Sequence, residues 1–256
     1  MRMWGKLAVL GGVTLIMSAC GKKGSLVYPD MLLPAAATAT TAIQSGSGVK
    51  IRFELPASDK AGNKLNDLAG VKINKSESRD SSESDCSSCM EGYRLFRKLY
   101  LDVLPDGVER IGKRMALLDG DVVAGNQYSY TVVPFTKEGI DGNSSPRVSV
   151  QLVQAALPPI IHVESQPTEI KLSFVSLPPV DGVLVGYNLY RALQKSVFSL
   201  RPVNNEPINA KEYVDSGLAR GTVYRYQARS LVRLPSGVII ESLVSHEVEG
   251  MLKDDE

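Results

Sequence analysis

The sequence is poor in the residues that most enzymes use for chemistry. It contains two histidines, three cysteines and one tryptophan among its 256 residues. It also contains no Gly-x-Ser-x-Gly elbow, no phosphate-binding loop and no HExxH pair. The carboxylates are numerous but scattered along the chain. These residues therefore predict no catalytic set, no cofactor and no metal.

A strong charge of one sign is also absent. The chain carries 29 basic and 28 acidic residues, which leaves a formal net charge of +1. Proteins that bind nucleic acid normally present a clustered basic surface, and this balance excludes nucleic acid as the predicted partner. One group of basic residues falls on neighbouring predicted strands, and alternating charges of this kind are typical of a solvated sheet face. The group is Arg97, Lys98, Arg110, Lys113 and Arg114.

A hydrophobic run long enough to cross a membrane is missing as well. The most apolar stretch is residues 7–17, which as a helix would cover about half of the hydrocarbon core of a bilayer. It follows a basic start with Arg2 and Lys6, and small residues come after it. This order predicts a secretory signal peptide.

The end of that segment carries a more specific signal. The motif MSAC ends at Cys20 and is followed by Gly21. It resembles the lipobox of bacterial lipoproteins, which implies that residues 1–19 are removed and that Cys20 is acylated. Acyl chains hold a protein durably on a membrane. Gly after the cysteine is similar to the outer-membrane sorting signal of Gram-negative bacteria. An ordinary signal peptide with a chance cysteine is the alternative.

Residues 20–34 are predicted to form a lipidated tether. Lys22 and Lys23 would lie at the lipid headgroups, which attract basic residues. The first five residues of the tether are also similar to small outer-membrane lipoproteins that assist lipopolysaccharide insertion.

The rest of the chain contains an internal repeat. Residues 49–56 (VKIRFELP) match residues 170–178 (IKLSFVSLP), and in both an apolar residue alternates with a polar one. This alternation predicts a half-buried strand in each copy. Residues 119–130 (DGDVVAGNQYSY) match residues 215–226 (DSGLARGTVYRY), again at the start of a predicted strand. Each copy then ends with a turn and a last strand.

This ordered set resembles the fibronectin type III domain, present twice over residues 35–252. The resemblance implies an all-β fold of two tandem immunoglobulin-like β-sandwiches. Tyr128 and Tyr224 fall where that family keeps its tyrosine corner, in which a phenol bonds to the backbone. Phe53 and Phe174 stand where members of the family usually have tryptophan.

The repeat also predicts the domain organisation. The first domain spans residues 35–154, the second spans residues 160–252, and residues 253–256 form an acidic tail. The linker, residues 155–159, contains two prolines. A short linker of this kind is semi-rigid, so we expect the domains to form a rod.

Two segments compete for the third strand of the first domain. Residues 91–97 (EGYRLFR) look most like residues 185–191 (VGYNLYR), but residues 67–75 lie at the matching distance from the preceding strand. We therefore assign residues 67–75 as the equivalent strand and residues 91–100 as the next one. The serine-rich segment between them, residues 76–90, is too polar to bury anything and is predicted to be a loop.

That loop contains Cys86 and Cys89 in a C-x-x-C arrangement. With Cys20 lipidated, they form an even pair in an oxidising compartment, which favours a disulfide. A metal site would need two further ligands, and a redox-active pair normally lies at a helix N-terminus. Covalent haem is excluded, because Met90 stands where a histidine is required. The resemblance also implies a structural pair at this loop.

The remaining polar residues suggest no second site. His162 and His246 are placed in the first and last strands of the second domain, as surface or packing residues. Asp119 and Asp121 resemble a calcium pair, but the second copy has only Asp215. We therefore interpret Asp119 and Asp215 as turn formers.

Together these features predict a non-catalytic, membrane-anchored binding, adhesion or scaffold module of the bacterial cell envelope. Its partner would be an envelope protein or glycan, met from the outer membrane. The first alternative is a structural accessory of an envelope assembly or transport complex related to lipopolysaccharide. The second is an exported thiol oxidoreductase that uses Cys86 and Cys89.

Overall fold

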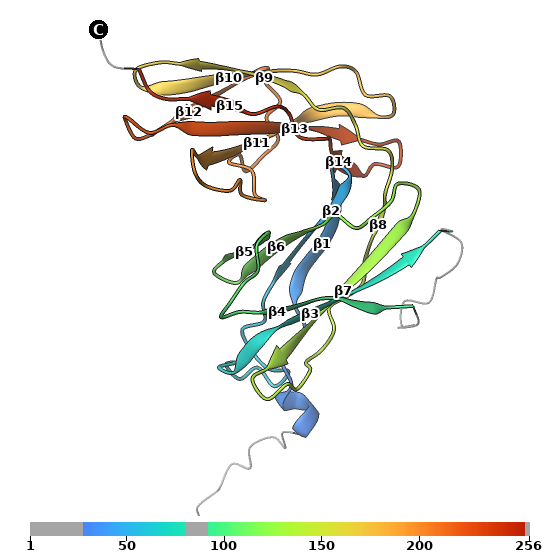
Figure 1. Cartoon of the computed structure of the whole chain (residues 1–256). Helices are drawn as coiled ribbons and strands as arrows, with labels where there is room; N and C mark the ends of the chain where they lie inside the picture. The colour runs from blue at the N-terminus through green and yellow to red at the C-terminus, as the bar shows by residue number, and fades with distance from the viewer. Residues whose placement is uncertain (1–27, 80–91, 254–256) are drawn as a thin grey trace, which may run out of the picture.

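The computed structural model describes residues 28–79 and 92–253, and within them strands make up nearly all of the regular secondary structure (Figure 1). The strands form two immunoglobulin-like β-sandwiches in tandem, so the predicted fold class is confirmed. The predicted signal peptide, Cys20, Cys86 and Cys89 lie outside the described residues. In the described part, no helix is both long enough and apolar enough to cross a bilayer.

The first sandwich follows a short 3-10 helix, η1 (Pro29–Leu32). Its strands are β1 (Thr38–Ser45), β2 (Gly48–Glu54), β3 (Leu68–Ser78), β4 (Arg94–Tyr100), β5 (Val108–Ile111), β6 (Arg114–Asp119), β7 (Gln127–Thr136) and β8 (Val148–Gln151). The second sandwich contains β9 (Ile160–Ser165), β10 (Glu169–Val175), β11 (Val183–Leu193), β12 (Glu212–Ser216), β13 (Tyr224–Arg233), β14 (Ile239–Glu241) and β15 (Val248–Gly250).

The sheets do not divide evenly between the two sandwiches. The first sandwich packs the run β1-β2-β6-β5 against the sheet β4-β3-β7-β8. The second packs β11, β13, β14 and β15 against the sheet β12-β10-β9. Strand β14 also pairs with β1, so one eight-stranded sheet continues through both sandwiches.

Each sandwich has its own hydrophobic core between its two sheets. In the first core Phe53 and Tyr130 are almost fully buried, and in the second core Phe174 and Tyr226 take the same places. The sequence resemblance would place tryptophan at these two phenylalanine positions. The smaller ring leaves the core apolar, and burying a side chain of this size contributes about 1.5–3 kcal/mol.

The strand assignment after the second strand is also confirmed. Strand β3 pairs with β7, which carries Tyr128, and β11 pairs with β13, which carries Tyr224. Residues 67–75 are therefore the counterpart of β11 in the second copy. Strand β4 is the extra neighbour of β3.

The end of the predicted tether is attached to the first sandwich. The backbone oxygens of Met31 and Leu33 accept hydrogen bonds from Ala61 and Lys60, and the oxygen of Pro34 accepts one from Asn143. The tether predicted for residues 20–34 therefore ends earlier than expected, because residues 31–34 are bonded to the first sandwich. Helix η1 lies at the end of the first sandwich that is opposite the second one (Figure 1).

The expected rod is also corrected by the structure. The strands of the second sandwich lie across the end of the first rather than continuing its long direction (Figure 1). The linker does not set this arrangement alone, because Ser45 pairs with Glu241 in parallel fashion and the Gly46 amide donates to the Glu241 carbonyl at 3.0 Å. Backbone pairing thus joins the two sandwiches directly.

Candidate functional site

The junction between the sandwiches is centred on a buried ion pair. Lys50, in β2, donates through Nζ to Glu241 Oε2, in β14, at 2.7 Å. The two side chains are only 3% and 1% exposed. Taking charges out of water is unfavourable unless they are paired and hydrogen-bonded, so this contact depends on its surroundings.

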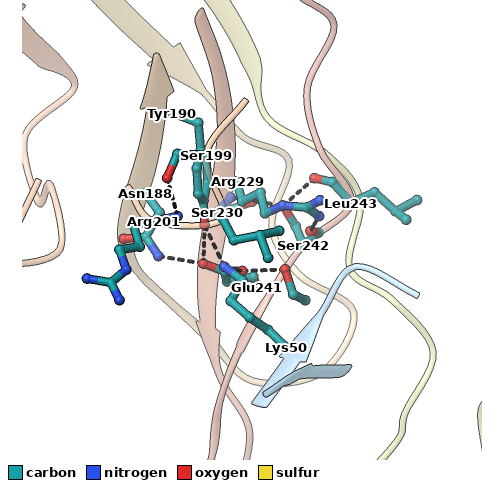
Figure 2. Close-up of polar contacts among 12 residues, drawn as sticks. Lys50, Asn188, Tyr190, Ser199, Arg201, Arg229, Ser230, Glu241, Ser242 and Leu243 are labelled. Carbon is teal, nitrogen blue, oxygen red and sulfur yellow. Dashed lines mark hydrogen bonds and ion pairs between the residues drawn. The ribbon is translucent and has the colours of Figure 1, made fainter. Parts of the chain in front are cut away.

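The surroundings satisfy Glu241 from both sandwiches. Ser45 donates to Oε2 at 2.5 Å, and Tyr190 and Asn188 donate to Oε1 at 2.5 and 2.6 Å. Figure 2 shows Lys50 reaching this carboxylate from the first sandwich while Tyr190 and Asn188 approach from the second. The carboxylate therefore acts as a fixed link between the two bodies.

The same contacts fix the protonation states at the junction. Burial alone would raise the pKa of Glu241. The charge of Lys50 and the hydrogen bonds that Glu241 accepts outweigh burial and lower that pKa from 4.5 to about 2. Burial also lowers the pKa of Lys50, and the negative charge of Glu241 partly opposes this effect. Burial and the nearby carboxylate raise the pKa of Tyr190. At neutral pH Glu241 is an anion and Tyr190 is a hydrogen-bond donor.

A further contact widens the junction away from the ion pair. Glu109 in β5 accepts hydrogen bonds from Ser199 Oγ at 3.0 Å and from the Leu200 amide at 2.6 Å. Within the first sandwich, the Gln44 side chain both donates to and accepts from the backbone of Val153, which fixes the chain just before the linker. The relative position of the sandwiches is thus set at more than one point.

An apolar groove of about 750 Å³ opens beside this junction. Its floor includes Val150 of the first sandwich and Val232 and Ile240 of the second. Residues 153–157 run along it, and the loop of residues 177–181 and the turn of residues 234–238 form its walls. Exposed apolar surface at a domain boundary is typical of ligand or partner sites. This groove is the candidate functional site.

Sequence reasoning missed the junction because β2 looks like an ordinary half-buried strand. Lys50 belongs to the polar set of the alternating pattern, yet it is only 2% exposed because the second sandwich covers it. Its partner Glu241 lies 191 positions away in the chain. Nothing in the local pattern distinguishes Lys50 from Arg52, which has the same place in the alternation.

The structure places both tyrosines of the expected corners at equivalent positions. Tyr128 Oη accepts a hydrogen bond from the Val123 amide at 2.8 Å, and Tyr224 Oη accepts one from the Ala219 amide at 2.9 Å. In each case the amide lies five residues upstream of the phenol. This is the geometry of a tyrosine corner, a device that ties a loop to the sheet.

The interpretation of Asp119 as a turn former is confirmed in part, because its Oδ1 accepts a hydrogen bond from the Asp121 amide at 3.0 Å. Both Asp119 and Asp215 have a second role that the sequence did not reveal. Asp119 is fully buried at the end of β6, where it pairs with Lys75 at 2.7 Å and accepts from Tyr130 at 2.7 Å. Asp215 lies within β12 and accepts from Arg191 and Tyr226. Asp119 therefore neutralises the charge of Lys75, and Asp215 neutralises the charge of Arg191.

One signal could have revealed this role. In both copies the aspartate precedes its tyrosine partner by 11 residues, so the pair repeats with the domain. A residue that only forms a turn has no reason to keep its distance from a buried tyrosine.

The other residues singled out in the sequence do not come together. His162 lies in β9, as expected, but His246 lies in the segment between β14 and β15 rather than in the last strand. Among residues 28–79 and 92–253, no group of three or more His, Cys, Asp or Glu side chains could hold a metal ion. The carboxylates described above are engaged in structural contacts.

The five basic residues are divided between sheets. Arg97 and Lys98 lie in β4, whereas Arg110 and Arg114 lie in β5 and β6 of the other sheet. Lys98 Nζ lies over the rings of Tyr100 and Phe135, at 5.0 and 4.8 Å from their centroids. These residues therefore do not form one basic face.

Comparison with known proteins adds little to this geometry. No protein-family model matches the chain, and no curated protein matches it. Among solved structures, the FN1–FN3 domains of chicken CNTN1 match with a TM-score of 0.32 and 13% identity, over 87% of this chain and 68% of that one. A myokine structure matches with a TM-score of 0.31 and 13% identity, over 38% of this chain and 98% of that one. The fibronectin-type-III-like assignment rests on the strand pairing and the tyrosine corners themselves.

Proposed function

We propose that this protein is a non-catalytic, lipid-anchored binding or scaffold module of the bacterial cell envelope. The observation that carries the proposal is the junction, where a buried ion pair and a continuous sheet hold two sandwiches as one body beside an open apolar groove. Sandwiches of this type commonly serve in binding, and a fixed arrangement of two of them limits the entropy lost when a partner docks.

Helix η1 and the groove lie at different ends of the first sandwich. Helix η1, where the described chain begins, is at the end opposite the second sandwich (Figure 1). The groove is at the junction end. A chain anchored at Cys20 would therefore hold the groove away from the membrane, facing an envelope protein or glycan. Outer-membrane location follows from the resemblance of the lipobox and Gly21.

A structural role in an envelope assembly is the second candidate. The rigid junction favours it as well, because a scaffold must hold its partners at a fixed distance. The two candidates share the anchor and the groove.

The anchor is tested by the intact mass of the protein extracted from membranes, with and without reduction and alkylation. We expect a mass that begins at Cys20 and includes acyl chains, with Cys86 and Cys89 protected from alkylation until they are reduced. Cys20→Ser should leave the protein unacylated and release it from the membrane fraction, while Cys86→Ser should not.

An unacylated native mass would contradict the anchor. Thiols that are free in the native protein would contradict the disulfide and would favour the redox or metal alternatives for Cys86 and Cys89.

A further inference from the structure

The lining of the junction groove limits what can bind there. Its volume of about 750 Å³ lies within the range of sites for small ligands, roughly 300–1,000 Å³, and is small for a folded partner. The apolar side chains come from both sandwiches. They include Val150 of the first sandwich and Leu177, Val180, Val232 and Ile240 of the second.

Several of these side chains face water in the free protein. Val180 is 97% exposed, Leu177 is 69% exposed and Leu157 is 59% exposed. Covering apolar surface of this kind is favourable in proportion to the area removed from water. The groove therefore gains most from a ligand that presents a continuous hydrocarbon surface to both walls.

Charge restricts the ligand further. Among the residues that line the groove, Asp181 is the only charged one, and no lysine or arginine is present. Asp181 follows Val180 directly and is exposed to solvent. An anionic head group at this end would be repelled, whereas a cationic one would be attracted.

The walls are held in place before any ligand arrives. The loop of residues 177–181 contains Pro178 and Pro179, whose rings restrict the backbone. The opposite wall is a tight turn, in which the Leu234 amide donates to Val238 at 2.9 Å and the Gly237 amide donates to Leu234 at 2.8 Å. A preformed groove loses little conformational entropy on binding.

We infer that the junction groove binds the alkyl chain of a single-chain amphiphile whose head group is cationic. This inference rests on the proposed function for the choice of the junction as the binding surface. It adds a small ligand that fills the groove, beside the envelope protein or glycan that would dock over the junction. The alkyl chain lies between the two sandwiches, and the head group lies beside Asp181.

The alkyl chain is tested by a length series. Octyl-, decyl- and dodecyltrimethylammonium are titrated calorimetrically, below their micelle concentrations, into the chain from Gly21 onward, which keeps every described residue. Each methylene that enters the groove should raise the affinity roughly fourfold, so two should raise it by roughly tenfold or more. An affinity that does not depend on chain length would overturn the inference.

The head group is tested by comparing decyltrimethylammonium with decanoate. The protein should bind the cation roughly fivefold more tightly, since Asp181 attracts one and repels the other across a partly screened distance. Asp181→Asn should reduce this preference to less than twofold and leave the dependence on chain length intact. Equal binding of the two ligands by the unmodified protein would contradict the head-group assignment.

The location is tested by a matched pair of variants. Leu177→Ser combined with Val180→Ser removes two exposed wall residues and should weaken decyltrimethylammonium binding roughly tenfold. Val103→Ser changes a valine that is 75% exposed outside the groove and should have no effect. All variants should keep the melting temperature of the unmodified protein, because the side chains they replace are exposed.

Unchanged binding by the wall variant would place the amphiphile elsewhere and overturn the inference. The proposed function would still hold if a photo-crosslinking residue placed at Val180 captured an envelope component in cells. If no envelope component were captured there but the amphiphile still bound, the proposed function would fail and the ligand assignment would stand.

Discussion

Lys50→Met is expected to lower the free energy of unfolding by about 3–5 kcal/mol, because it leaves the carboxylate of Glu241 buried without its counter-ion. Glu241→Gln should have a similar effect, since it leaves the Lys50 ammonium buried. The double variant should recover most of the loss, because a neutral pair of similar volume needs no charge compensation. Chemical unfolding followed by circular dichroism measures all three.

The repeat supplies a control for this experiment. Lys171 holds the place of Lys50 in the second copy, but it is half-exposed and no second sandwich covers it. Lys171→Met should therefore change the stability by less than about 1 kcal/mol. If Lys50→Met proves as mild as Lys171→Met, the buried pair does not hold the junction.

The junction itself can be followed at one amide. The Gly46 N–H donates to the Glu241 carbonyl across the two sandwiches, so its hydrogen exchange reports the opening of the contact. In Lys50→Met this exchange should be faster by roughly a hundredfold or more, which corresponds to about 3 kcal/mol. Amides of the separate cores should change less. A uniform change across both cores would point to global unfolding instead.

The ion pair also gives the junction a defined dependence on pH. The pKa of Glu241 is lowered from 4.5 to about 2 in the folded protein, so its contribution is fully present above pH 4.5. That contribution is lost as the pH falls from about 4.5 towards 2. Between pH 4.5 and pH 2 the free energy of unfolding should therefore fall by about 2–3 kcal/mol more in the unmodified protein than in the double variant of Lys50 and Glu241.

Asp119→Asn should destabilise the first sandwich by about 3–5 kcal/mol, whereas Asp215→Asn should cost the second only about 1–2 kcal/mol. The two aspartates have the same place in the repeat but different cations. Lys75 is 3% exposed, so it would stay buried and unpaired once Asp119 is neutral. Arg191 is 34% exposed, so water can solvate it when Asp215 is replaced.

Hydrogen exchange resolved by sandwich is the appropriate measurement, because the two cores need not unfold together. Asp121→Asn provides the control, since the contact that Asp121 makes with Lys75 is through its backbone oxygen and survives the change. Equal losses for Asp119→Asn and Asp215→Asn would mean that the burial of the cation does not decide the cost.

The repeat made most of the fold predictable. The alternating pattern around Phe53 and Phe174, and the Tyr-x-Tyr segments that begin at Tyr128 and Tyr224, identify equivalent strands without any structure. Each of these signals is local, because a strand shows its buried face every second residue. The distance between strands was enough to identify β3 in the presence of a more similar competitor.

The junction and the groove could not be predicted in this way. Lys50 has the position of a solvent-facing residue in its own strand, and only the second sandwich makes it a buried one. The groove likewise takes its lining from segments on both sides of the linker. Neither feature exists in one domain alone, so no pattern within a domain reports it.

An envelope component is expected to bind the protein at the junction. The most direct test places a photo-crosslinking residue at Val180 in the full chain, in cells that make the protein, with Val103 as the control position. Both valines are exposed, but only Val180 lines the groove. We predict a discrete crosslinked species from Val180, absent at Val103 and lost when Cys20→Ser removes the anchor. Equal crosslinking at both positions, or none at either, would contradict the account.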